Sequence, residues 1–189
     1  MLTHTLDQRT AGRSPLLVLA DPLDHRRRTA CSDLLSVDQP RSALVFAYHR
    51  RPREVVDGLD DPRGATIIDL GEDSDADGGA GFGPEVTVER CGAADLTGVG
   101  VAVTRAIERH TEGRLHVCLG SLTTLLQYVD RETAFKFLHV TLSRLDSADA
   151  VAHGHLDPVA VDAETVATLS SLFDSVLERD DDGWAVQSA

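Results

Sequence analysis

The sequence predicts a single α/β domain in which a largely parallel sheet carries helices on both faces. Short apolar stretches alternate with segments of helical periodicity along almost the whole chain, and this order is typical of parallel strands joined by helical crossovers. Residues 115–119, LHVCL, are apolar enough for a strand that is covered on both faces. A length of 189 residues suits one well-buried domain and is short for two.

The strand at 115–119 and the two helices after it are the centre of this prediction. Alternation along the strand places His116 and Cys118 on one face and the three other side chains, all leucine or valine, on the opposite face. Ser121 is positioned to cap a short helix, and Asp130 to cap a longer one. The longer helix carries one apolar stripe, formed by Phe135, Leu138, Leu142 and Leu145.

The other elements are predicted from apolar stretches that end at Gly, Pro or acidic residues. Strands are expected at 16–20, 42–49, 65–70, 86–88, 150–156 and around 184–186. Helices are expected at 24–35, at 53–59, after Asp95 and after Asp162, the last with an apolar face of Val166, Leu169, Phe173, Val176 and Leu177. The domain then spans 14–187, with a disordered N-terminus at 1–13 and a mobile Gly- and Asp-rich loop at 71–84.

The composition indicates a halophilic protein. Acidic residues outnumber basic ones by 31 to 18, the formal net charge is −13, and Lys136 is the only lysine. A strongly anionic surface keeps a protein hydrated and separated from its neighbours in high salt, so a haloarchaeal or similar source is expected. The same surface disfavours contact with a phosphate backbone, and nucleic acid is not an expected partner.

The N-terminal residues and the cysteines favour a cytoplasmic location. The N-terminal residues contain no basic segment followed by an apolar run, and no stretch of the chain is apolar enough to cross a membrane. Cys31, Cys91 and Cys118 are odd in number, far apart and without CxxC spacing, a pattern that favours reduced intracellular thiols. A cytoplasmic protein without membrane contact is therefore expected.

Residues 119–145, LGSLTTLLQYVDRETAFKFLHVTLSRL, resemble the KaiC/GvpD-like branch of the RecA superfamily, at the place where that branch has its Walker B strand and the helices after it. The segments LTGVGVAV, AVAHGHLDP and ETVATLSSLFD resemble a haloarchaeal group of short members of this branch. The resemblance covers roughly 14–187. It implies a three-layer RecA-like fold whose relatives often assemble into rings.

The nucleotide-binding motifs of that branch are degenerate here. A P-loop requires G-x-x-x-x-G-K-[ST] after the first strand, whereas residues 21–29 read DPLDHRRRT and contain neither Gly nor Lys. The resemblance also implies a metal-orienting Asp at the end of the Walker B strand, where this chain has Gly120. Several separate sources of transition-state stabilisation are thus missing, which predicts a pseudo-ATPase.

Two sets of residues are candidates for ligand binding. The first could hold ATP or another anion at a helix N-terminus, although a solvated basic face is the ordinary alternative; it consists of Arg26, Arg27, Arg28, Thr29, Gly120 and Ser121. The second could hold a metal, because alternate positions of one strand share a face; it consists of His153, His155 and Asp157. His116 and Cys118 are paired in the same way on another strand, but no zinc-module spacing is present, and strand histidines often simply pack. Tyr48 and His49 end the second strand and could line the same crevice as Gly120.

These observations predict a non-catalytic RecA/KaiC-like regulatory or scaffolding protein that acts through a protein partner or through self-association, with no required cofactor. The alternative is a switch that binds ATP or another anion without a normal P-loop. A metallohydrolase that uses the two histidines and Asp157 is a third hypothesis.

Overall fold

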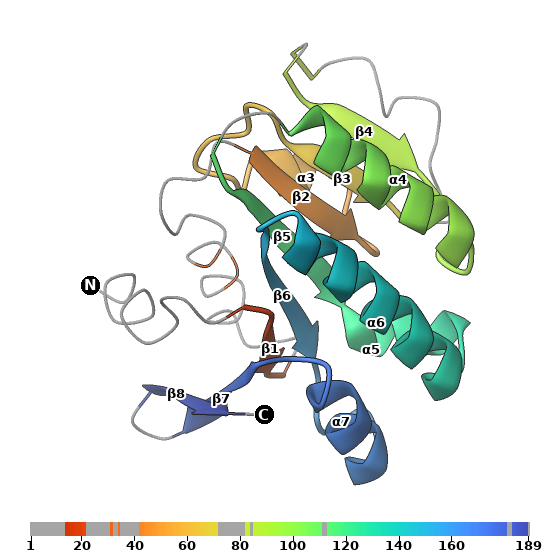
Figure 1. The fold of residues 1–189 in the computed structure, drawn as a ribbon, viewed down its shortest axis with the longest axis vertical. Coiled ribbons are helices and arrows are strands. Elements are labelled where there is room, and N and C mark those ends of the chain that lie inside the picture. The colour runs from red at the N-terminus through yellow and green to blue at the C-terminus, as the bar shows by residue number, and fades with distance from the viewer. Residues whose placement is uncertain are drawn as a thin grey trace.

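The computed structural model describes residues 14–21, 31, 34, 42–71, 82–83, 85–110, 113–180 and 183–188. Within these residues the chain forms an eight-stranded sheet in which all neighbouring strands are parallel except the last pair (Figure 1). In spatial order the strands are β4 (Thr87–Arg90), β3 (Thr66–Asp69), β2 (Ser42–Ala47), β5 (Leu115–Ser121), β6 (Val151–Leu156), β1 (Leu16–Leu19), β7 (Ser175–Asp180) and β8 (Gly183–Ser188).

Helices cover both faces of this sheet, as the sequence predicts. Four of them contribute to the main apolar core on one face: α4 (Leu96–Arg109), α5 (Leu122–Tyr128), α6 (Arg131–Ser147) and α7 (Ala163–Ser170) (Figure 1). The short helix α3 (Pro52–Val56) lies on the other face, where Val55 packs against Val45 and Ile67. The fold is therefore a three-layer α/β arrangement with a mostly parallel sheet.

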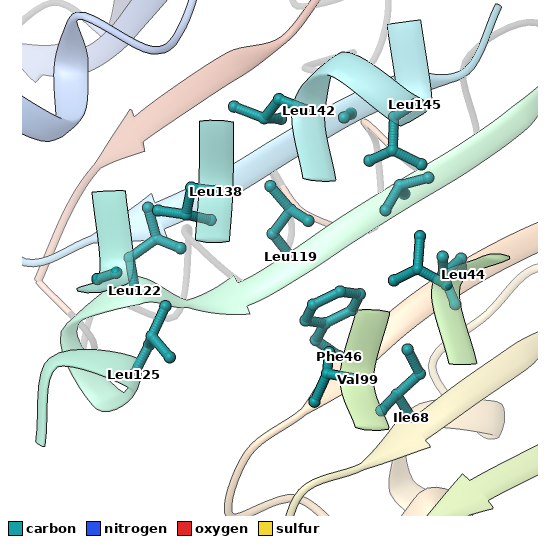
Figure 2. Packing of buried hydrophobic residues seen from close by; sticks show 14 of the residues in the cluster. Leu44, Phe46, Ile68, Val99, Leu119, Leu122, Leu125, Leu138, Leu142 and Leu145 are labelled. Atoms are coloured by element: carbon teal, nitrogen blue, oxygen red, sulfur yellow. The ribbon is translucent and has the colours of Figure 1, made fainter. Parts of the chain in front are cut away.

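The main core lies between the sheet and these four helices. Leu44, Phe46 and Ile68 reach it from β2 and β3, and Leu119 reaches it from β5 (Figure 2). The predicted stripe of α6 faces it too, with Leu138, Leu142 and Leu145 buried and Phe135 partly buried. Burial of so many large apolar side chains, at roughly 25 cal/mol per Å² of apolar area, is the main force that holds helices and sheet together.

The two faces of β5 differ as the alternation predicts. Val117 lies in the main core, whereas Cys118 belongs to a second apolar cluster on the opposite face with Ala43 and Val45. His116 shares that opposite face, and its Nδ1 lies 3.3 Å from the carbonyl oxygen of Leu34.

The predicted N-terminal elements are only partly within the described residues. Of the helix expected at 24–35, Cys31 and Leu34 are described, and both are helical. The disordered N-terminus expected at 1–13 and most of the loop expected at 71–84 lie outside the described residues. These expectations stay predictions.

The helix predicted to run from Asp162 through Leu177 is wrong in its second half. Helix α7 ends at Ser170, and Ser175–Asp180 forms β7. The prediction rested on the i, i+3, i+4 spacing of apolar residues, which would set them on one face of a helix. In the structure Val176 and Leu177 point to opposite sides of the sheet and enter different apolar clusters. Parallel pairing with β1, which sets Leu17 opposite Val176, overrides the weak helical preference of this segment.

Each of the longer helices begins at a capping side chain that the sequence predicts. The side chains of Asp95, Ser121, Asp130 and Asp162 each accept a hydrogen bond from the backbone N–H three residues further on. Such caps satisfy backbone donors that the helix itself leaves unpaired. They fix where each helix begins after its loop.

Two of these capping carboxylates, Asp130 and Asp162, are expected to make the stability of the fold sensitive to acid. The pKa of Asp130 and that of Asp162 are lowered, first of all by the backbone N–H groups of Thr133 and Thr165. A lowered folded-state pKa stabilises the fold above the unfolded value of about 3.9, and this stabilisation disappears as the pH falls through the folded value. The double variant Asp130→Asn/Asp162→Asn keeps both caps but removes their titration. We expect its melting temperature to fall less than that of wild type between about pH 5 and pH 2.

Thermal unfolding followed by circular dichroism at fixed salt measures this difference. The control is Asp146→Asn/Asp174→Asn, which removes the same charge from two exposed carboxylates that cap no helix. It is expected to retain the acid sensitivity of wild type. Equal acid loss in the cap variant and in wild type would contradict the prediction.

Candidate functional site

The strand order creates a switch point between β2 and β5. After β2 the chain continues outward to β3, and after β5 it continues in the opposite direction to β6. In open α/β sheets ligands bind at the carboxyl ends of strands where the order reverses in this way. Tyr48 follows the carboxyl end of β2, and Gly120 and Ser121 form the carboxyl end of β5. Of the residues that the sequence predicts for this region, the structure sets Tyr48 beside Gly120.

Gly120 is held in a conformation and a space that a side chain does not fit. Its φ is +69°, which favours glycine. A Cβ atom at this position would lie 2.6 Å from the carbonyl oxygen of Phe46 and 3.1 Å from a ring carbon of Tyr48. The acid that the resemblance implies at the end of this strand is excluded by β2 as well as being absent from the sequence.

Tyr48 lies beside Gly120 at the switch point. Its ring is buried, with 7% of the residue exposed. Burial, and secondly the neighbouring Tyr128, raise the pKa of its hydroxyl well above the usual range. His49, by contrast, is exposed and has a φ of +44°. Of the two strand-end residues that the sequence pairs, only Tyr48 is buried.

The polar groups next to the switch point stabilise turns and helix ends. The hydroxyl of Ser121 accepts a hydrogen bond of 3.2 Å from the N–H of Thr124 and so caps α5. The N–H of Asp157 donates to Oγ1 of Thr123 over 2.9 Å, and the Asp157 carboxylate accepts from the N–H of Val159. These contacts order the loops after β5 and β6.

The end of β3 carries a buried acid that sequence reasoning missed. Asp69 is only 7% exposed, accepts a hydrogen bond of 3.2 Å from the N–H of Gly71, and lies 3.9 Å from Nε of Arg90. A single Asp at the end of an apolar strand was the only signal. Its contacts are those of a paired residue that fixes the turn after β3.

Four of the six residues that the sequence predicts for anion binding lie outside the described residues. Arg26, Arg27, Arg28 and Thr29 belong to the segment 22–30, so their distance from Gly120 and Ser121 is not part of this structure. A cavity of about 360 Å³ exists elsewhere, beside α3 and the segments that lead into β3 and β4. Both acidic and basic side chains line it, among them Arg53, Asp57 and Glu85.

A group of thiol and imidazole side chains lies on the opposite face of the sheet from the main core. It contains Cys31, Cys118, His153 and His155, whose potential ligand atoms all lie within 4.8 Å of one another. The Sγ atom of Cys31 lies 3.4 Å from Sγ of Cys118 and 3.3 Å from Nε2 of His153. The two imidazoles meet edge to face, with ring centroids 5.1 Å apart. Three of the four residues are buried.

This group overlaps only in part with the metal set that the sequence suggests. His153 and His155 share a face of β6, as their spacing predicts, but Asp157 follows the end of the strand and lies outside the group. Strand pairing adds Cys118, because Cys118 on β5 stands opposite His153 on β6. Cys31 was missed because it is 87 residues from Cys118 in sequence and no local spacing links them.

Fold and site together define a three-layer α/β protein in which Tyr48 lies against Gly120 at the switch point and a largely buried group of two thiols and two imidazoles lies on one face of the sheet. The chain belongs to the DUF7504 family, a family of unknown function whose profile matches residues 13–179. No match was found among curated proteins.

Many solved structures share the fold, and two Pyrococcus horikoshii proteins are examples. The first is a Pyrococcus horikoshii OT3 protein, PH0250, with a TM-score of 0.65 and 11% identity over 99% of this chain and 92% of that one. The second is the uncharacterized protein PH0321 from Pyrococcus horikoshii in complex with an unknown peptide; its TM-score is 0.61, with 13% identity over 97% of this chain and 86% of that one. Among the described residues, no helix is both long and apolar enough to span a membrane.

Proposed function

We propose that this protein is a non-hydrolysing relative of RecA/KaiC-like ATPases that works as a regulatory or scaffolding protein in a halophilic cytoplasm. The observation that carries the proposal is the contact of Tyr48 with Gly120 at the switch point. In a phosphoryl-transfer enzyme this region supplies groups that hold metal and phosphate. Here a buried aromatic ring lies against a glycine that leaves no space for a carboxylate.

The neighbouring polar groups support the same proposal. The hydroxyl of Ser121 already accepts the hydrogen bond that caps α5, and Asp157 is engaged in the turn after β6. Metal-assisted phosphoryl transfer needs oxygen ligands that point into an open site. Among the described residues at the switch point, the Ser121 and Asp157 oxygens are engaged in a helix cap and a turn, which supports a role in recognition.

A protein partner, or a second copy of the chain, fits the surface chemistry better than a nucleic acid does. The net charge of −13 gives a phosphate backbone no electrostatic attraction to the surface. At about 1 M salt the screening length is only about 3 Å, so long-range charge effects contribute little to any association. Under those conditions association depends on apolar contact and hydrogen bonds. The described part of the chain offers exposed large apolar side chains at Val101, Val140 and Val159.

The direct test is a titration of the purified protein with ATP and Mg²⁺ in molar KCl. A ligand that binds the folded state raises the melting temperature. We therefore expect neither release of phosphate nor a rise in melting temperature when ATP and Mg²⁺ are added. Micromolar binding with turnover would refute the proposal. Binding without turnover would favour the anion-switch alternative, for which replacement of Arg26, Arg27 and Arg28 by alanine should abolish the thermal shift.

A further inference from the structure

We infer that Cys31, Cys118, His153 and His155 bind one Zn²⁺ ion in a four-coordinate site between β5, β6 and the helical residue Cys31. Nothing in the proposed function requires this site. It lies on the opposite face of the sheet from the main core, in the apolar cluster that contains Cys118, Ala43 and Val45. The inference stands on the chemistry and the spacing of the four side chains.

The spacing of the ligand atoms is close to that of a tetrahedral zinc centre. With Zn–S near 2.3 Å and Zn–N near 2.0 Å, tetrahedral ligand atoms lie about 3.3–3.8 Å apart. The two contacts of the Cys31 Sγ atom, 3.4 Å to Cys118 and 3.3 Å to His153, are within about 0.4 Å of the separations expected for these atom pairs. All four donor atoms lie within 4.8 Å of one another, so a small inward adjustment completes the set.

The donor set selects the kind of metal. Two thiols and two imidazoles are the ligands of Cys₂His₂ zinc sites, whereas Mg²⁺ and Ca²⁺ prefer oxygen. The four donors come from β5, from β6 and from Cys31, which precedes β2. Four protein ligands leave no position open for water or substrate, which assigns a structural role to the ion.

The two sulfur atoms are too far apart for a disulfide and close enough to share an ion. A disulfide between the two cysteines would require the sulfur atoms to approach from 3.4 Å to about 2.05 Å. An ion at the centre of the cluster needs no such approach, because its ligands remain more than about 3 Å apart.

The site is tested by titration of the full chain, purified without a histidine tag and stripped with a chelator in molar KCl. We expect one Co²⁺ per chain to produce a thiolate-to-cobalt charge-transfer band and the visible bands of four-coordinate cobalt, and one equivalent of Zn²⁺ to remove both. Cys118→Ser and His153→Ala should each weaken Co²⁺ binding more than about 100-fold, since even the outer partners of metal ligands contribute 10- to 100-fold.

Matched controls separate the site from other thiols and imidazoles. Cys91→Ser removes a partly buried thiol outside the cluster, and His139→Ala removes an exposed imidazole on α6. Both should bind Co²⁺ as wild type does. If the ligand variants do not fold, the wild-type spectrum still decides. Failure of reduced wild-type protein to take up Co²⁺ or Zn²⁺, or equal binding by Cys118→Ser and Cys91→Ser, would overturn the inference.

Discussion

Gly120→Ala is expected to destabilise the protein by about 2–5 kcal/mol. A left-handed backbone costs an L-residue roughly 1–2 kcal/mol, and the φ of Gly120 is +69°. The added Cβ would lie 2.6 Å from the carbonyl oxygen of Phe46, which belongs to a central strand and cannot move alone. Forcing an extra carbon into such a space costs a further ~1–3 kcal/mol.

Gly120→Asp should be worse than Gly120→Ala, because the carboxylate adds a buried charge to the same clash. Restoring the acid that the resemblance implies is therefore expected to unfold the protein before it restores any metal binding. Denaturant unfolding at fixed salt gives the free energy of unfolding for each variant. Gly92→Ala is the control, because its nearest neighbour would be 3.9 Å away. A Gly120→Ala variant as stable as Gly92→Ala would contradict the close contact with β2.

Leu138→Ala should reduce the free energy of unfolding by about 2–5 kcal/mol, through lost apolar burial and the cavity that remains. Leu138 lies on α6, is 1% exposed, and packs in the main core with Leu119 and Leu142 (Figure 2). The surrounding side chains come from the sheet and from other helices, so the cavity has few ways to collapse.

Val140→Ala is the matched control, because it lies two residues further along the same helix and is 50% exposed. It is expected to change the free energy of unfolding by no more than about 0.5 kcal/mol. Equal effects of the two substitutions would mean that α6 does not pack on the sheet through the Leu138 side. The same denaturant experiment measures both.

The fold was largely predictable because each element carries its own local signal. Parallel strands covered on both faces are short and apolar, and helix starts carry Ser or Asp caps, as at Ser121 and Asp130. The one clear error, the continuation of α7 to Leu177, arose where the apolar spacing of a helix and that of a buried strand coincide. Pairing with β1 decided between them, and pairing is not a local property.

The candidate sites were predictable only where two residues share one strand. His153 and His155 are an example, because period two alone sets them on one face. Cys31 could not be added from the sequence, since it lies 87 residues from Cys118 and 122 residues from His153 and no local spacing links them. The sequence likewise shows that residue 120 is glycine, but not that Tyr48 lies against it.

The sequence by itself thus determined the α/β class, the capped helices, the division of β5 into two faces and the absence of an acid at position 120. These properties depend on periodicity and on residue type, both of which are local. The tertiary structure alone decided that β5 lies between β2 and β6. That order sets Tyr48 against Gly120 at the carboxyl edge, and it gathers two thiols and two imidazoles on one face of the sheet. Such contacts join residues far apart in sequence, so only the packed sheet can specify them.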